Sequence, residues 1–216
     1  MVIISNFFDT FVAPNIKAFK NSLSPFNPLL KMLNFYRINS VNDSLFQPFF
    51  ELYNEAFPAV ERRSWAGLEH ELKFEKRFCA HALMQDCKFA GLFNYWTFDT
   101  FYYIEHLAIL PDFQGHKIGT EAIKIYKTQT KLPIIFEVEM PTTPDSIRRI
   151  NFYEKQGFHV VSHKYAQPPY HSDGFLIPME LMTNQLHFAD THFNIIKDTL
   201  YNQVYHYEVE KEVENK

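Results

Sequence analysis

Residues 103–120 read YIEHLAILPDFQGHKIGT, and this stretch decides the fold of the 216-residue chain. It begins as an apolar run typical of a buried strand, turns at Pro111 and continues with helical spacing. Gly115 and Gly119, two of only six glycines, lie where the loop becomes the helix. Unpaired N–H groups at a helix N-terminus point toward one place, so the junction is suited to bind a phosphate or pyrophosphate. An ordinary loop-to-helix junction explains the same residues.

A second informative stretch, residues 148–158, reads RRINFYEKQGF. It predicts a helix that Gly157 closes, followed directly by a strand. The apolar strand that precedes this helix contains Glu137 and Glu139, and side chains alternate along a strand. These two carboxylates are therefore expected on one face of the sheet.

Periodicity along the rest of the chain predicts an α/β fold with a mixed sheet and helices on its faces. An aromatic helical stripe ends at Pro58, and residues 145–157 form a helix capped by Asp145 or Ser146. Strands are expected over 33–41, 77–84, 89–98, 101–110, 132–140, 158–165 and 175–182, and helices over 46–57, over 64–75 and from about residue 115.

The chain divides into three parts by pattern. Residues 1–31 lack a sustained period and are expected to be a loosely structured extension, with Met32 as an alternative start. Residues 32–182 form the single domain, and residues 183–216 form a helical tail. An apolar stripe in this tail, after Asp190 or Thr191 as cap, predicts a helix that covers the core, or else a homodimer contact or a lid.

Composition excludes several classes of protein. The formal net charge of −4 argues against a nucleic-acid binder, and no apolar run is long enough to span a membrane. The two cysteines, Cys79 and Cys87, are expected to be small apolar fillers in a reduced, cytoplasmic protein without a signal peptide. The histidines and cysteines show no metal-ligand spacing, so no metal site is expected.

The two stretches together resemble the GNAT superfamily of acyl-CoA-dependent N-acetyltransferases. The first signature of that family, Arg/Gln-x-x-Gly-x-Gly/Ala after an apolar strand and a proline, corresponds to Gln114–Gly119. The second signature corresponds to residues 152–158, which read FYEKQGF. Both motifs occur in the family's order, and the expected elements over 33–182 agree with a central mixed, mostly antiparallel sheet with splayed strands flanked by helices.

The resemblance implies transfer of the acetyl group of acetyl-CoA directly to a primary amine of a small molecule or peptide. Backbone groups of Leu107 and Ile109 would contact the pantetheine and the thioester, residues 114–120 would hold the pyrophosphate, and Tyr153 would be the general acid. A tyrosine packed in the core is the alternative for that residue. The implied cofactor-binding residues are Leu107, Ala108, Ile109, Gln114, Gly115, His116, Lys117, Ile118, Gly119, Thr120, Asn151, Tyr153 and Lys155.

A general base is needed because an alkyl ammonium has a pKa of about 10.4. Glu105 is the first candidate and Glu137 the second, while a solvated or salt-bridged carboxylate is the alternative for each. The acceptor is expected to contact Arg63, Trp65, Glu139 and Tyr170.

One position departs from the family signature. Lys117 occupies the place of a glycine that lets the backbone approach the pyrophosphate. This departure keeps open the alternative of a CoA-binding module without catalysis. A further alternative, an acyltransferase for a longer acyl-CoA, would suit the aromatic richness of the chain. Polyamines, aminoglycosides, amino acids and protein N-termini all stay open as acceptors.

Overall fold

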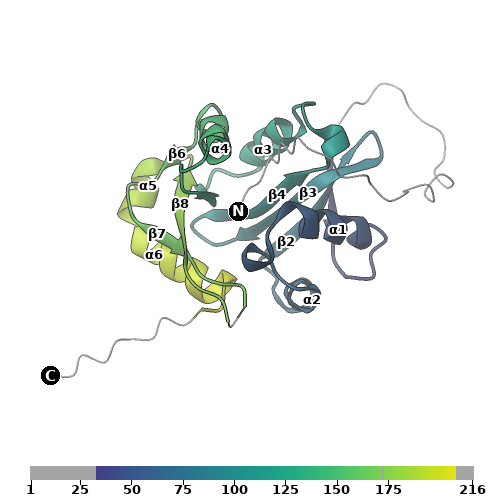
Figure 1. Cartoon of the computed structure of the whole chain (residues 1–216), viewed down its shortest axis with the longest axis horizontal. Coiled ribbons are helices and arrows are strands. Elements are labelled where there is room, and N and C mark those ends of the chain that lie inside the picture. The colour runs from purple at the N-terminus through teal and green to yellow at the C-terminus, as the bar shows by residue number, and fades with distance from the viewer. Residues whose placement is uncertain (1–32, 172, 208–216) are drawn as a thin grey trace.

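The computed structural model describes residues 33–171 and 173–207, and the expected extension over residues 1–31 lies outside this range (Figure 1). The described residues form a mixed sheet with helices on both faces, which confirms the predicted α/β class. The strands are β1 (Leu33–Ile38), β2 (Phe78–Gln85), β3 (Lys88–Thr97), β4 (Tyr102–Ile109), β5 (Ile134–Glu139), β6 (His159–Val160), β7 (Tyr165–Gln167) and β8 (Ile177–Thr183).

The sheet has the strand order β1-β2-β3-β4-β5-β8-β6, and β7 also pairs with β8. Only the pairing of β4 with β5 is parallel, and the other described pairs are antiparallel. The helices are α1 (Phe46–Ala56), α2 (Trp65–Phe74), α3 (Ile118–Gln129), α4 (Pro144–Glu154), α5 (Leu186–Thr191) and α6 (Phe193–Thr199), with 3₁₀ turns at Ala59–Glu61 and Pro111–Phe113 and a π-helical turn at Leu200–Val204.

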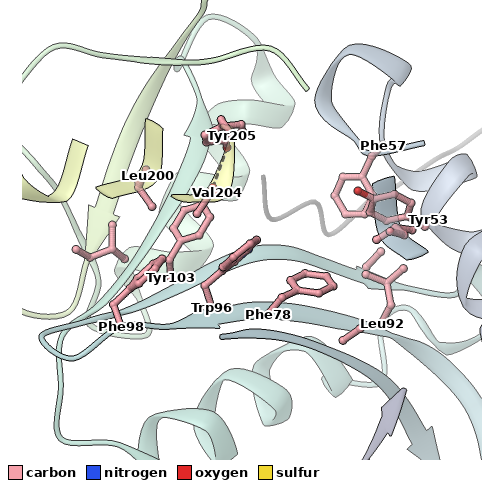
Figure 2. Close-up of a cluster of buried hydrophobic side chains, with 14 of the residues drawn as sticks. Tyr53, Phe57, Phe78, Leu92, Trp96, Phe98, Tyr103, Leu200, Val204 and Tyr205 are labelled. Atoms are coloured by element: carbon pink, nitrogen blue, oxygen red, sulfur yellow. Dashed lines mark hydrogen bonds between the residues drawn. The ribbon is translucent and has the colours of Figure 1, made fainter. Parts of the chain in front are cut away.

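An apolar cluster packs on each face of the sheet. Helices α3 and α4 cover one face, where Tyr126 and Tyr153 are buried. On the other face α1 and the C-terminal helices pack on a second cluster, shown in Figure 2, which contains Trp96 and Tyr103. Fully burying one such aromatic ring contributes about 1.5–3 kcal/mol, so this aromatic-rich chain has an extensive core.

Helix α4 begins earlier than its sequence suggests. The prediction that Asp145 or Ser146 is the N-cap is wrong, because Thr143 occupies that position. The Thr143 hydroxyl accepts a hydrogen bond from the Ser146 N–H, and the Ser146 hydroxyl accepts one from the Thr143 N–H. Pro144 then stands at the first helical position, where its fixed φ is favourable.

The tail also differs from the prediction of a single helix after Asp190 or Thr191. It begins at Leu186, and at His192 the backbone leaves helical geometry, so α5 and α6 are separate. The apolar residues of the stripe, Ile196, Leu200 and Val204, are buried in the main core. The tail therefore packs on the domain, as the covering-helix alternative predicts.

The two cysteines have different environments. Cys79 is buried in β2, as expected for an apolar filler. The same expectation is wrong for Cys87, which is exposed at φ +61° in the turn between β2 and β3. Turn geometry rather than packing determines this position. Within residues 33–171 and 173–207, no helix combines the length and apolarity needed to cross a lipid bilayer.

Candidate active site

Strands β4 and β5 separate part-way along their length. Tyr102–Ile104 pair with Ile134–Phe136, and in the described chain this pairing ends there. The following residues of β4, up to Ile109, therefore present backbone N–H and C=O groups to the opening. Leu107 and Ile109, for which the resemblance implies backbone contacts to the cofactor, lie in this part of β4 beyond its pairing with β5.

A β-bulge lies at the start of this opening. Asn94 of β3 pairs with His106, while its neighbour Tyr95 pairs with Ile104, so Glu105 is the extra residue on β4. Bulges bend a strand, increase its twist and redirect a side chain, and they are common beside active sites. The bulge thus turns β4 at the residue where it leaves β5.

Glu105 is almost fully buried, with 1% of its surface exposed. Its carboxylate accepts hydrogen bonds from Trp96 Nε1 and from the Tyr170 hydroxyl, both at 2.9 Å, and lies 3.0 Å from Arg63 Nη2. Burial alone would raise the pKa of Glu105, but Arg63, His106 and the hydrogen-bond donors outweigh it and lower the pKa. Glu105 is consequently a stably ionised carboxylate within an ion pair.

Glu137 lies on β5 directly after the last residue paired with β4, and it is fully buried. Its Oε1 accepts a hydrogen bond from the Tyr165 hydroxyl, and its Oε2 accepts one of 2.6 Å from the Tyr205 hydroxyl. Burial raises the pKa of Glu137, and the tyrosine hydroxyls offset only part of this rise. Glu137 is therefore a more basic carboxylate than Glu105.

Tyr153 approaches the sheet from the opposite face. It is fully buried on α4, and its ring packs against Phe136 with a centroid distance of 4.6 Å. Because side chains alternate on β5, Phe136 points toward α4 while Glu137 points away from it. Burial raises the pKa of Tyr153, so its phenol is protonated at neutral pH.

The loop before α3 has the geometry of an anion site. Gly115 has φ +77°, and a Cβ added there would meet no atom within 4 Å. Lys117 also takes a left-handed conformation, with φ +63°, and it caps α3 without a side-chain hydrogen bond. The first N–H groups of α3 are thus not capped by the Lys117 side chain, and the lysine reproduces a backbone conformation that favours glycine.

The other residues of the expected cofactor site surround this loop and the end of α4. The Gln114 side chain donates a hydrogen bond of 3.0 Å to the Ile109 carbonyl, which ties the loop to the end of β4. Asn151 and Lys155 are exposed at the C-terminal end of α4. His116 is exposed, Thr120 is half-buried, and Ala108, Ile118 and Gly119 are buried.

The comparison with protein families agrees with this arrangement. The model of the acetyltransferase (GNAT) family matches residues 44–158, which is more than half of the chain. The chain belongs to the GNAT acetyltransferase family. The matched region contains both signatures and ends at Phe158.

Two relatives support membership of the GNAT family. A Bacteroides thetaiotaomicron protein of known structure, classed as a GNAT-family acetyltransferase, is 31% identical, with a TM-score of 0.77 over 81% of this chain and 99% of that one. YjbC of Bacillus subtilis (strain 168), classed by name as an acetyltransferase, is 30% identical over 121 residues. That match covers 55% of this chain and 58% of YjbC, so it spans less than two thirds of the relative.

A more distant structure shares the GNAT fold. An aminoglycoside 6′-N-acetyltransferase complexed with coenzyme A is 15% identical, with a TM-score of 0.50 over 69% of this chain and 95% of that one. At this identity the likeness concerns the fold alone. It agrees with the mixed, mostly antiparallel sheet described above.

The residues expected to contact the acceptor are distributed over this GNAT domain. Arg63 is buried with Glu105, and Tyr170 hydrogen-bonds the same carboxylate. Glu139 lies at the end of β5, where it pairs with Arg149 and keeps 38% of its side chain exposed. Trp65 packs edge-on against Phe46 and Phe50 of α1. The structure thus brings Arg63 and Tyr170 together, whereas the ring contacts of Trp65 are with α1.

Tyr205 is a side chain at the opening that sequence reasoning did not single out. Tyr165 and Tyr205 hold Glu137, and Glu61 is buried with one carboxylate oxygen that lacks a hydrogen-bond partner in the described part of the chain. His106 is buried, which lowers its pKa to about 3, and its Nε2 lies 3.1 Å from the Glu61 carbonyl. No group of at least three His, Cys, Asp or Glu side chains suited to a metal ion occurs in the described residues.

Proposed function

We propose that this GNAT-family chain is an N-acetyltransferase that transfers the acetyl group of acetyl-CoA directly to a primary amine. The observation that carries the proposal is the opening between β4 and β5, with Glu105 and Glu137 on one face and Tyr153 on the other. Acyl transfer to an amine needs a proton acceptor on the amine side and a proton donor on the thiol side.

The residues around α3 fit a CoA pyrophosphate. The open space above Gly115 and the left-handed Lys117 leave the first N–H groups of α3 accessible to an anion, and the Lys117 ammonium adds positive charge. The backbone of Leu107–Ile109 would contact the pantetheine arm and the thioester carbonyl, and Asn151 of α4 and Lys155, the C-cap of that helix, would also contact the cofactor. When bound there, acetyl-CoA supplies the activated acetyl group.

Glu137 is the proton acceptor that we favour. Glu105 is paired with the Arg63 guanidinium and has a lowered pKa, which weakens it as a base. Within the described residues no salt bridge includes Glu137, and burial raises its pKa toward that of the amine. Glu105 then acts mainly through its negative charge, which holds Arg63 and Tyr170.

Tyr153 is the proposed proton donor. In the complete step, the cationic amine first gives one proton to Glu137, which passes it to solvent. The neutral nitrogen then forms a bond to the acetyl carbon, the carbon–sulfur bond breaks, and Glu137 accepts the second proton that the nitrogen loses. The departing thiolate takes a proton from Tyr153, whose phenol burial keeps protonated until that moment. Solvent later restores both groups, so atoms and charges balance.

The acceptor that this site would take is a cationic primary amine. Glu139, partly exposed at the end of β5, and Glu61 place further carboxylate charge near Glu137.

Two free cysteines agree with a reduced, cytoplasmic setting for the enzyme. The alternatives are a CoA-binding module without catalysis and an acyltransferase for a longer acyl-CoA.

A binding and turnover experiment distinguishes these functions. Calorimetric titration with acetyl-CoA, hexanoyl-CoA, CoA and ATP tests the cofactor, and thiol release is then followed with putrescine, tyramine, kanamycin and an alanyl peptide. The proposal predicts binding of acetyl-CoA but not ATP, and CoA release that requires an amine. Binding without CoA release from any amine would support the non-catalytic module, and faster release from hexanoyl-CoA would support the longer acyl donor.

A further inference from the structure

The C-terminal residues reach the centre of the molecule although they lie outside the family match. That match ends at residue 158, whereas the π-helical turn Leu200–Val204 and Tyr205 come more than forty residues later. Figure 2 shows Val204 and Tyr205 beside Tyr103 of β4, with the hydrogen bond between the two tyrosines dashed. Single π-helical turns are rare and often lie at functional sites.

The hydrogen bonds of Tyr205 have a defined direction. Its hydroxyl lies 2.6 Å from Glu137 Oε2, and because a carboxylate only accepts, Tyr205 must be the donor. The Tyr205 oxygen lies 3.0 Å from the Tyr103 hydroxyl, so Tyr103 must donate in turn. A chain of hydroxyls therefore ends on Glu137, and each bond in such a chain strengthens the next.

Arg63 fastens the same C-terminal turn to the other glutamate. Its Nη2 donates a hydrogen bond of 2.7 Å to the Val204 carbonyl and lies 3.0 Å from Glu105 Oε1. Its Nη1 lies 3.2 Å from Glu71, which also contacts His206 at 3.2 Å. One guanidinium thus joins the opening of the sheet, α2 and the C-terminal turn in a buried network.

We propose that Tyr205, which directly follows the π-helical turn Leu200–Val204, belongs to the acyl-transfer site as a positioning residue for the carboxylate of Glu137. The inference rests on the proposed function and adds a residue that the family match does not include. Tyr205 and Tyr165 each bond one oxygen of Glu137, which fixes the plane of the carboxylate. Each oxygen keeps a second lone pair for the proton of the amine.

The groups that influence Glu137 come from several elements. A hydrogen bond to the charged form favours that form, so Tyr205 makes Glu137 easier to ionise. Glu61 carries like charge, and Glu137 is among the groups that raise the pKa of Glu61. The titratable groups that face Glu137 are Tyr103 of β4, Tyr165 of β7, Tyr201 of the C-terminal turn, Tyr205 directly after it, and Glu61 of the first 3₁₀ turn.

Tyr205→Phe tests the inference, with Tyr201→Phe as a matched control. Tyr201 belongs to the turn that Tyr205 follows, but its hydroxyl donates to the Ala166 carbonyl at 2.7 Å rather than to a glutamate. The full chain and both variants are compared by circular dichroism, by calorimetric titration with acetyl-CoA, and by the pH profile of kcat/KM with the most active amine of the panel above. Tyr205→Phe is expected to lower kcat about tenfold or more at neutral pH, with unchanged acetyl-CoA affinity.

The pH profile separates positioning from a merely structural role. Loss of the Tyr205 hydrogen bond raises the pKa of Glu137, so the acidic limb of the profile moves to higher pH in Tyr205→Phe and stays in place in Tyr201→Phe. Tyr103→Phe serves if Tyr205→Phe does not fold. It removes the hydroxyl that donates to Tyr205 and that also interacts with Glu137, so it should move the acidic limb in the same direction.

Two results would overturn the inference, and they differ from each other. An active wild type whose kcat and pH profile are unaltered by Tyr205→Phe and Tyr103→Phe would remove the positioning role and leave the proposed function intact. A wild type that binds acetyl-CoA and releases no CoA with any amine would remove the proposed function, and the role of Tyr205 in catalysis with it.

Discussion

Glu105 and Glu137 occupy corresponding positions on neighbouring strands, each one residue beyond the last pair, Ile104 with Phe136. Their environments are opposite. Arg63 and two neutral donors surround Glu105 and lower its pKa, whereas tyrosine hydroxyls hold Glu137 and burial raises its pKa. Two carboxylates whose pKa values are displaced in opposite directions are well suited to different roles in one site.

Glu137→Gln should lower turnover and leave cofactor binding intact. An amide does not accept the proton of the amine, and general-base catalysis contributes about 10²–10⁴ in rate. The measurement is kcat for CoA release beside calorimetric affinity for acetyl-CoA. Glu139→Gln, at the partly exposed end of the same strand, is the control and should keep most of kcat. If Glu137→Gln kept the wild-type kcat, the general base would be another residue.

Glu137 should also make stability depend on pH. The pKa of Glu137 is raised in the folded state, so the protonated carboxyl stabilises the folded protein. This contribution to the free energy of unfolding is fully present below the unfolded pKa of about 4.3 and is lost as pH rises through the folded pKa. Urea unfolding at a series of pH values should therefore show wild type losing stability relative to Glu137→Gln as pH increases. A constant difference between the two proteins over that range would mean that the pKa of Glu137 is not raised.

Tyr153→Phe should reduce turnover by about 10²–10⁴ with little change in acetyl-CoA affinity. The variant removes one hydroxyl and keeps the ring that packs on Phe136. Tyr126→Phe offers a control, since Tyr126 is a buried tyrosine on the same face of the sheet. Full activity of Tyr153→Phe would mean that Tyr153 is not the proton donor and that its ring serves only in packing.

Substitutions at Lys117 separate backbone conformation from charge. Glycine tolerates φ +63°, so Lys117→Gly should keep acetyl-CoA binding and relieve about 1 kcal/mol of left-handed strain, measured by urea unfolding. Lys117→Ala removes the ammonium and keeps the strain, whereas Lys117→Pro forces φ to about −65° and should abolish binding. If Lys117→Pro bound acetyl-CoA as tightly as wild type, this loop would not hold the pyrophosphate.

Much of the fold follows from local sequence, because periodicity records which face of an element is buried. Helix α2 begins at Trp65 and ends at Phe74, within the predicted range, and β5 lies within its predicted strand. The GNAT resemblance also located the loop before α3, where Lys117 adopts the glycine-like conformation that the signature requires.

The surroundings of the two glutamates did not follow from local sequence. Arg63 lies in a charged stretch that is typical of an exposed loop, yet its side chain is buried. The carboxylates of Glu71 and Glu105 balance its charge there, and the Val204 carbonyl accepts a hydrogen bond from it. Its partners are up to 141 residues away in sequence, and no periodic pattern encodes contacts between such distant segments. Tyr205 was missed for the same reason, since its partner Glu137 is 68 residues distant.

A single-turnover reaction examines direct acetyl transfer at this opening. The full chain is mixed with one equivalent of acetyl-CoA and an excess of the best amine, and mass spectrometry follows CoA, the acetamide product and the intact protein. Direct transfer predicts one acetamide for each CoA released and a protein of unchanged mass. CoA released without acetamide, or acetate retained on the protein, would contradict it.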